Sequence, residues 1–305
     1  MILSATTGPI EKRLGYECAI RMIGDAGFDA YDIDMCKMHV KDDPLAKDDY
    51  LEVVDRLRAV AEEKGIVCNQ AHAPFPTQLN GNDVYNKMTR KCILRSMEVA
   101  SLLGAKILVV HPIKNSSSSQ AKGYSYEPFE SRAALYEANL RFFRELIPYC
   151  EKYNVKIAVE NMWERHILKN DVLIPSTLGF AEEHAAFIDA LDSEWIVGCL
   201  DTGHTLICSE KLDESVRRLG ARLKSLHVHD SNGYEDSHAL PYSMKTDWDA
   251  FLGALAEIGY DGDFTFEANS FFNHFPDGLL PTALRFMCDV GRHMVGKIAS
   301  HPNRT

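Results

Sequence analysis

The amino-acid sequence predicts an α/β fold, a (β/α)8 TIM barrel that forms a single domain over residues 1–305. Short apolar runs alternate with longer amphipathic segments along the whole chain, at intervals of roughly 30 to 45 residues. The apolar runs number eight, which is the strand count of a closed barrel. No GxGxxG motif follows the first run, which disfavours an open dinucleotide-binding sheet.

The expected strands span residues 2–4, 28–34, 66–72, 106–111, 155–160, 195–201, 223–230 and 263–267. Between them, apolar residues recur with helical spacing, so that each segment can cover a strand from outside. The clearest sets are Leu51/Val54/Leu57/Ala61, Ile93/Met97/Ala100/Leu103, Leu135/Ala138/Phe142/Leu146/Tyr149 and Leu284/Met287/Gly291/Met294/Ile298. A polar insert at 115–126 follows the fourth strand and is expected on the catalytic face, as a lid or an ordinary loop.

Composition and charge narrow the class of protein. With 46% hydrophobic residues the chain can bury a large core, and it has neither a basic leader nor about 18 consecutive apolar residues. The sequence therefore predicts a soluble, cytoplasmic protein with no membrane partner. Its eight cysteines lack a CxxC pair and are expected to be reduced thiols. A net charge of −11 argues against a nucleic-acid partner, and a homo-oligomer is compatible with the sequence.

Six consecutive strands end on, or close to, a side chain that can bind a metal ion. These side chains are His72, His111, Glu160, Asp201, His227 and Glu267. The C-terminal ends of barrel strands meet at one rim, so these residues should converge. Alternation supports this in the seventh strand, where Ser225, His227 and His229 share one face and Leu226 and Val228 share the other. The alternation in the third strand is ambiguous.

Each position also has a structural explanation. A single strand-end histidine such as His72 is more often hydrogen-bonded than metal-bound. A carboxylate such as Glu160 or Glu267 is harder to dismiss, because burying it unpaired would cost several kcal/mol. The mixed carboxylate and imidazole set suits a divalent metal, with Mn²⁺ as the first expectation and Zn²⁺, Mg²⁺ or Co²⁺ as alternatives. His166, His229 and Asp230 are further candidates to orient ligands or contact substrate.

Short motifs surround these positions: Ala71-His-Ala-Pro-Phe, Val110-His-Pro, Val159-Glu-Asn, Leu200-Asp-Thr-Gly-His, Leu226-His-Val-His-Asp and Asp247-Trp…Ile258-Gly-Tyr-Asp-Gly…Phe266-Glu. In this order they make the whole chain resemble the xylose isomerase-like TIM-barrel superfamily, which holds sugar and sugar-phosphate isomerases and epimerases together with endonuclease IV. The resemblance implies one divalent metal held by Glu160, Asp201, His227 and Glu267. Similarity to endonuclease IV implies additional metal positions at His72, His111, His204, Asp236 and His238, so the number of metals stays open.

The favoured hypothesis is a metal-dependent isomerase or epimerase of a small sugar or sugar phosphate, working by proton transfer through a metal-stabilised enediolate. Glu160 and Glu267 would carry the proton, and His204 and His229 would hold hydroxyls. The expected apolar wall of the substrate pocket is Phe75, Trp163 and Phe271.

The alternative is an endonuclease IV-like zinc phosphodiesterase that acts on abasic DNA. Its weakness is a shortage of basic residues in the rim loops, where the loop after the fourth strand offers Lys114 and Lys122. A non-catalytic sugar-binding barrel is disfavoured, because so many converging ionisable groups would be costly to keep without a function.

Overall fold

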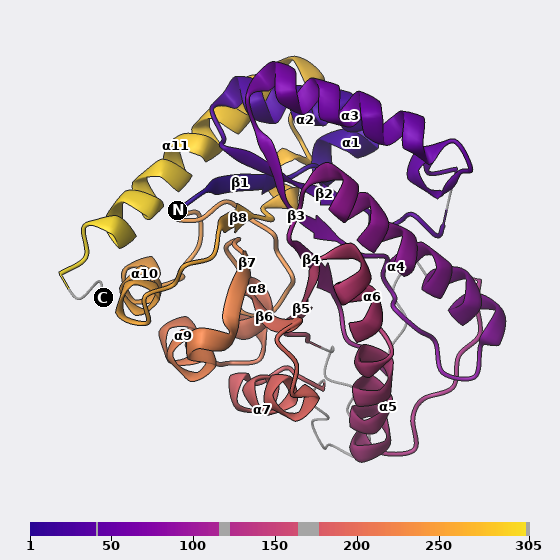
Figure 1. The fold of residues 1–305 in the computed structure, drawn as a ribbon. Coiled ribbons are helices and arrows are strands. Elements are labelled where there is room, and N and C mark those ends of the chain that lie inside the picture. Colours follow the sequence, from indigo (N-terminus) through magenta and orange to yellow (C-terminus); the bar gives the residue numbers. More distant parts are fainter. Residues whose placement is uncertain (41, 116–122, 164–176, 303–305) are drawn as a thin grey trace.

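The structure is a computed structural model of the chain, and it describes residues 1–40, 42–115, 123–163 and 177–302. Eight parallel strands form one sheet in the order β7-β6-β5-β4-β3-β2-β1-β8. The two ends of this sheet also meet, because Val228 N donates to Thr265 O at 2.9 Å and Glu267 N donates to Val228 O at 3.1 Å. With helices arranged around the strands (Figure 1), the predicted TIM barrel is confirmed.

The strands are β1 (Leu3–Thr6), β2 (Ala30–Asp34), β3 (Val67–His72), β4 (Ile107–Val110), β5 (Lys156–Glu160), β6 (Ile196–Asp201), β7 (Leu223–His227) and β8 (Phe264–Phe266). Each overlaps one predicted strand. The main α-helices are α1 (Gly8–Leu14), α2 (Tyr16–Ala26), α3 (Tyr50–Lys64), α4 (Asp83–Leu103), α5 (Arg132–Arg144), α6 (Ile147–Tyr153), α7 (Ala181–Leu191), α8 (Thr202–Ile207), α9 (Leu212–Leu219), α10 (Trp248–Glu257) and α11 (Leu280–Ala299). Short 3-10 turns η1 (Pro44–Ala46), η3 (Gly220–Arg222), η4 (Asn269–Phe272) and η5 (Asp277–Leu279) complete the described elements.

Two details of the helical prediction are wrong. The periodic stretch from Leu135 to Tyr149 is two helices, because Pro148 lies in the first turn of α6, where its missing N–H is tolerated. Leu51, expected on the buried face of α3, is 51% exposed, and Val53 is buried instead. The other members of these apolar sets largely face the core.

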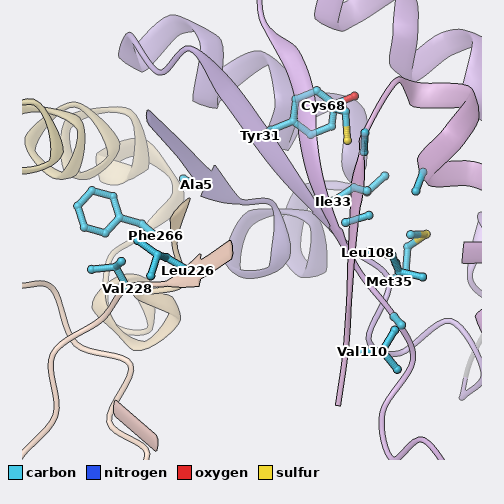
Figure 2. Packing of buried hydrophobic residues seen from close by; sticks show 14 of the residues in the cluster. Ala5, Tyr31, Ile33, Met35, Cys68, Leu108, Val110, Leu226, Val228 and Phe266 are labelled. Atoms are coloured by element: carbon cyan, nitrogen blue, oxygen red, sulfur yellow. The ribbon is translucent and has the colours of Figure 1, made fainter. Parts of the chain in front are cut away.

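Alternate strand residues face the helices and the barrel axis. Leu108 and Val110 of β4 belong to the large cluster packed under the helices, whereas Val109 joins a small apolar group inside the barrel. Figure 2 shows part of the large cluster, with Leu226 and Phe266 grouped where β7 meets β8. Alternation thus sets the direction of each strand-end side chain.

The ambiguous third strand contains an irregularity. Tyr31 pairs with Cys68 and Asp32 pairs with Gln70, so Asn69 has no partner in the register. An extra residue of this kind is a β-bulge, which interrupts the alternation. Beyond the bulge the pattern resumes, with Ala71 toward the helices and both Gln70 and His72 toward the barrel interior.

Two further properties bear on the sequence-based expectations. All eight cysteines are free thiols. None of the helices in the described part of the chain has the length and apolarity that a membrane span requires. His166 and positions 116–122 of the predicted rim insert lie outside the described residues.

Candidate active site

The ends of β5, β6 and β7, together with the residue after β8, bring four predicted ligands to one point. Glu160, Asp201, His227 and Glu267 each offer a ligand atom, and these atoms lie within 4.8 Å of one another. We call these four residues the inner cluster. His227 Nδ1 lies 3.2 Å from Glu160 Oε1 and 3.2 Å from Glu267 Oε2. The inner cluster is almost sealed from solvent, since only the Glu267 side chain is measurably open, at 16% exposure.

Several buried polar atoms of the inner cluster have no hydrogen-bond partner among the described residues. They are both carboxylate oxygens of Glu160 and both ring nitrogens of His227. A buried polar atom without a partner costs about 1–3 kcal/mol, and more when it is charged. A divalent cation would bind such oxygens and a ring nitrogen as ligands, and a carboxylate-imidazole set is one that Mn²⁺ and Zn²⁺ accept. The residues therefore fit a divalent cation.

Two histidines flank Glu160 on the side of β3 and β4. His111 Nε2 lies 3.0 Å and His72 Nε2 lies 3.7 Å from Glu160 Oε2, and the three residues form a second group of candidate ligands. The Nδ1 atom of His72 is within 2.9 Å of the Ala73 carbonyl, to which it donates. When His72 is neutral, its one N–H is on Nδ1, so the lone pair is on Nε2 and faces Glu160.

A third group, which we call the outer cluster, comprises His204 of α8 together with His229, Asp236 and His238, which follow β7. His238 Nε2 lies 3.1 Å and His204 Nε2 lies 3.5 Å from Asp236 Oδ2. His238 has a left-handed φ of 40° and is held by its Nδ1, which is 2.8 Å from the Glu267 carbonyl oxygen. Strained backbone held in this way is typical of functional sites. The ligand atoms of His229, Asp236 and His238 lie within 4.8 Å of one another.

His229 is fully buried and contacts the inner cluster directly. Its Nε2 lies 3.0 Å from both carboxylate oxygens of Asp201. Its ring rests against Gly203, where an added Cβ would come within 2.1 Å of His229 Cε1. This geometry favours an orienting role for His229 over contact with a substrate hydroxyl. It also explains the glycine of the Asp201-Thr-Gly-His motif, which the sequence alone left unexplained.

Asp230 has a structural role rather than a place in the site. Its carboxylate accepts hydrogen bonds from the Met244 amide, the Thr246 hydroxyl and the Trp248 indole. Asp230 thereby anchors the long segment between β7 and α10, which carries Asp236 and His238. Contact of Asp230 with substrate is therefore not supported.

Charges in the metal-free site compensate one another. Burial alone would raise the pKa of Glu160, but His111 and His227 hold it well below its usual range. Burial lowers the pKa of His111 to about 4, against the attraction of Glu160. Burial also opposes a charge on His204, yet Asp201 and Asp236 raise its pKa to about 9. Protons on histidines thus balance the carboxylates where a cation would otherwise do so.

Two of the three predicted wall residues lie beside the site. The Phe75 ring packs against His111 at 4.4 Å between centroids, and the Trp163 ring lies 6.4 Å from His204. Lys114 Nζ sits 5.9 Å from the centroid of Phe75 and 5.3 Å from that of Trp163. Phe271 packs against two neighbouring phenylalanines, so its place in the wall stays a prediction.

Two buried residues that the sequence did not single out, Asp32 and Gln70, are bonded to each other, and Asp32 lies against His227. Asp32 Oδ2 is 3.6 Å from His227 Nε2, and Gln70 Nε2 donates to the same oxygen at 3.1 Å. The signal that could have revealed Asp32 is alternation in β2, where Tyr31 and Ile33 face the helices and Asp32 faces the axis.

Comparison with known proteins places this chain in a family. A model described as xylose isomerase-like TIM barrel matches residues 20–289. The D-psicose 3-epimerase of Enterocloster bolteae is 25% identical over 256 residues, which cover 81% of this chain and 74% of that protein. An uncharacterized protein of Sinorhizobium fredii is 22% identical over 277 residues, which cover 83% of this chain and 81% of the relative.

Two solved structures show the same fold. A D-tagatose 3-epimerase-like protein superposes with a TM-score of 0.73 at 20% identity, covering 98% of both chains. The IOLI protein, crystallised with a zinc atom, superposes with a TM-score of 0.72 at 18% identity, covering 98% of this chain and 100% of its own. The family match extends over most of the chain, and the protein therefore belongs to the xylose isomerase-like TIM-barrel family.

Proposed function

We propose that this protein is a divalent-metal-dependent epimerase or isomerase of a small carbohydrate. The observation that carries the proposal is the inner cluster, in which two carboxylates of different strands each approach His227 Nδ1 to 3.2 Å. The similarity to a D-psicose 3-epimerase supports the substrate class.

Glu160, Asp201, His227 and Glu267 would hold the cation, with Mn²⁺ as the first choice and Zn²⁺, Co²⁺ or Mg²⁺ as alternatives. When bound, it would polarise adjacent oxygens of the sugar and stabilise the negative charge left by deprotonation. His229 would keep the Asp201 carboxylate in its orientation through two contacts of 3.0 Å.

Glu160 and Glu267 would move the proton. Epimerisation next to a carbonyl requires that a proton leave one face of the carbon and return to the other, so two bases from different strands suit it. His111 and His227 keep the pKa of Glu160 low, so its carboxylate is ionised. His204 Nδ1 lies 2.8 Å from the Asn161 carbonyl, so its Nε2 is the atom that would reach a sugar hydroxyl.

Phe75 and Trp163 would cover the carbon face of the sugar and exclude water. Their rings lie against His111 and His204, which border the inner cluster on two sides. Excluding water strengthens electrostatic interactions in the site and prevents loss of the proton to solvent.

The second candidate is a zinc phosphodiesterase. It is favoured by one observation, the two further groups of candidate ligands around His72 and Asp236, which would allow additional cations. The rim argues against a DNA substrate. No lysine or arginine occurs between Glu267 and Arg285, a loop that is described throughout. Proteins that bind a duplex use several phosphate contacts from such residues.

The test loads the purified protein with Mn²⁺ and presents a panel of ketoses and ketose phosphates in D₂O. Exchange of a carbon-bound proton for deuterium, followed by ¹H NMR, is the expected result. The same preparation is analysed for metal content and incubated with DNA that contains an abasic site. Cleavage of that DNA without exchange in any sugar would overturn the proposal and favour the phosphodiesterase.

A further inference from the structure

A chain of hydrogen bonds crosses the barrel interior next to the inner cluster. The Ser225 hydroxyl donates to Gln70 Oε1 at 2.6 Å, and Gln70 Nε2 donates to Asp32 Oδ2 at 3.1 Å. Ser225, Gln70 and Asp32 come from β7, β3 and β2, and each is at most 2% exposed. Such a network is rigid, because water does not compete for its bonds.

The direction of these bonds is fixed by the chemistry of the groups. An ionised carboxylate can only accept hydrogen bonds, so Asp32 must face the amide nitrogen of Gln70 rather than its oxygen. The amide oxygen then faces Ser225, which has a hydroxyl to donate. The network is therefore internally consistent only when Asp32 is its final acceptor.

Within the inner cluster, His227 lies between Asp32 and the two glutamates, Glu160 and Glu267. Its Nε2 is 3.6 Å from Asp32 Oδ2, which is an ion-pair distance slightly longer than a hydrogen bond, and its Nδ1 faces Glu160 and Glu267. Asp32 Oδ1 has no hydrogen-bond partner among the described residues, so the carboxylate can still accept. A neutral imidazole carries one N–H and one lone pair. When Glu160 and Glu267 bind a cation, the carboxylate of Asp32 at Nε2 favours the tautomer that leaves the lone pair on Nδ1.

We propose that Asp32 is a positioning residue, which fixes His227 as the Nε2–H tautomer and directs the Nδ1 lone pair at the cation of the inner cluster. Gln70 and Ser225 hold Asp32 in place. The inference rests on the proposed function, since it assumes that the inner cluster binds a divalent metal. Removing a carboxylate that supports a ligating histidine typically weakens metal binding by about 10- to 100-fold.

The test compares Asp32→Leu, which removes the acceptor with little change in size, with Asp32→Asn, which keeps an acceptor oxygen but loses the charge. Equilibrium dialysis of each metal-free protein against Co²⁺ alone gives the dissociation constant. We expect binding to weaken about 10- to 100-fold in Asp32→Leu and less in Asp32→Asn. The visible spectrum of bound Co²⁺ and the ¹⁵N chemical shifts of His227 should change in Asp32→Leu, and wild-type-like signals in Asp32→Asn would indicate rescue.

Ser4→Ala is the matched control. Ser4 bonds Thr265 at 2.8 Å, also as a buried pair, and within the described part of the chain no hydrogen bond or ion pair joins it to His227, so its loss should leave Co²⁺ affinity unchanged. If both Asp32 variants bound Co²⁺ within twofold of the wild type with unchanged spectra, the inference would be wrong. If the wild-type protein bound no divalent metal, the proposed function itself would fail, which is a different result.

Discussion

The inner and outer clusters both combine carboxylates with imidazoles but are built differently. Inner residues stand at or next to strand ends. Among the described residues, both carboxylate oxygens of Glu160 and both ring nitrogens of His227 lack a hydrogen-bond partner, whereas in the outer cluster one oxygen of Asp236 does. In the outer cluster, Asp236 and His238 lie on a loop, their side chains are 26% and 18% exposed, and they contact each other at 3.1 Å. The inner cluster therefore needs a cation most, whereas the outer cluster already compensates much of its own charge.

The two clusters are nevertheless connected. His229 contacts Asp201 of the inner cluster and stacks on His238 of the outer cluster at 4.2 Å between ring centroids. The Glu267 carbonyl also accepts from His238. A substitution in either cluster should therefore affect the other. Comparing how substitutions in each cluster change activity and metal binding measures how far the clusters are independent.

Replacement of the central inner carboxylate should have the largest effect. Glu160→Gln removes a ligand and a proton carrier together, so we expect kcat for sugar proton exchange to fall by at least about 1,000-fold. Metal content, measured by mass spectrometry, should fall with it. Glu214→Gln is the control, because the Glu214 side chain is 64% exposed on α9. Activity retained in Glu160→Gln would remove Glu160 from both roles.

The contact between the two clusters can be broken without touching a ligand. In Gly203→Ala the new methyl group would overlap the His229 ring. Either His229 must lose its contact with Asp201, or helix α8, which carries residue 203, must shift. We expect metal binding to weaken by about 10-fold or more. The free energy of unfolding of the metal-free protein, from urea titration, should fall by about 1–3 kcal/mol.

Gly296→Ala provides the matched control for that substitution. Gly296 lies within α11, where an added Cβ meets open space. Alanine is the better helix former, so this variant should be more stable by up to about 1 kcal/mol and should bind metal normally. Wild-type metal affinity in Gly203→Ala would show that His229 does not orient Asp201.

These positions also show what the sequence could and could not predict. Eight strands and the convergence of Glu160 with His227 follow from a period of two and from the geometry of parallel barrels, which require no knowledge of contacts. The bulge at Asn69 could not be predicted, because no local pattern in the amino-acid sequence marks it. Gly203 was equally hidden, because its neighbour His229 lies 26 positions along the chain and meets it only in three dimensions. The alternation of side chains along β2 could have placed Asp32 inside the barrel. It was missed because it lies in the middle of the strand, whereas the candidates were chosen at strand ends.

The outer cluster should contribute less than the inner one. Asp236→Asn keeps the size of the side chain but removes the charge that faces His204 and His238. We expect exchange activity to fall by about 10-fold, with at least one metal still bound per chain. Activity and metal content measured on the same sample distinguish the clusters. Complete loss of metal in Asp236→Asn would show that the two clusters form one cooperative site.

The smallest effect concerns stability and pH. Asp201 and Asp236 outweigh burial and raise the pKa of His204 to about 9 in the metal-free protein, above the value near 6.5 of an unfolded chain. The resulting stabilisation is fully present below about pH 6.5 and is lost as the pH rises through about 9. The melting temperature of chelated protein should therefore decrease by a few degrees between pH 6.5 and 9.

A cation bound in place of these protons would remove that dependence, because histidines ligate metal in the neutral form and metal competes with protons. Metal-loaded protein should consequently show a flatter melting profile than chelated protein over the same pH range, measured by scanning calorimetry. Asp236→Asn should flatten the chelated profile as well, since His204 loses one of the carboxylates that raise its pKa. If the melting temperature of chelated Asp236→Asn changed with pH as it does in the wild type, the pH dependence would come from a titrating group in the inner cluster. Asp236 would then have no measurable influence on that group.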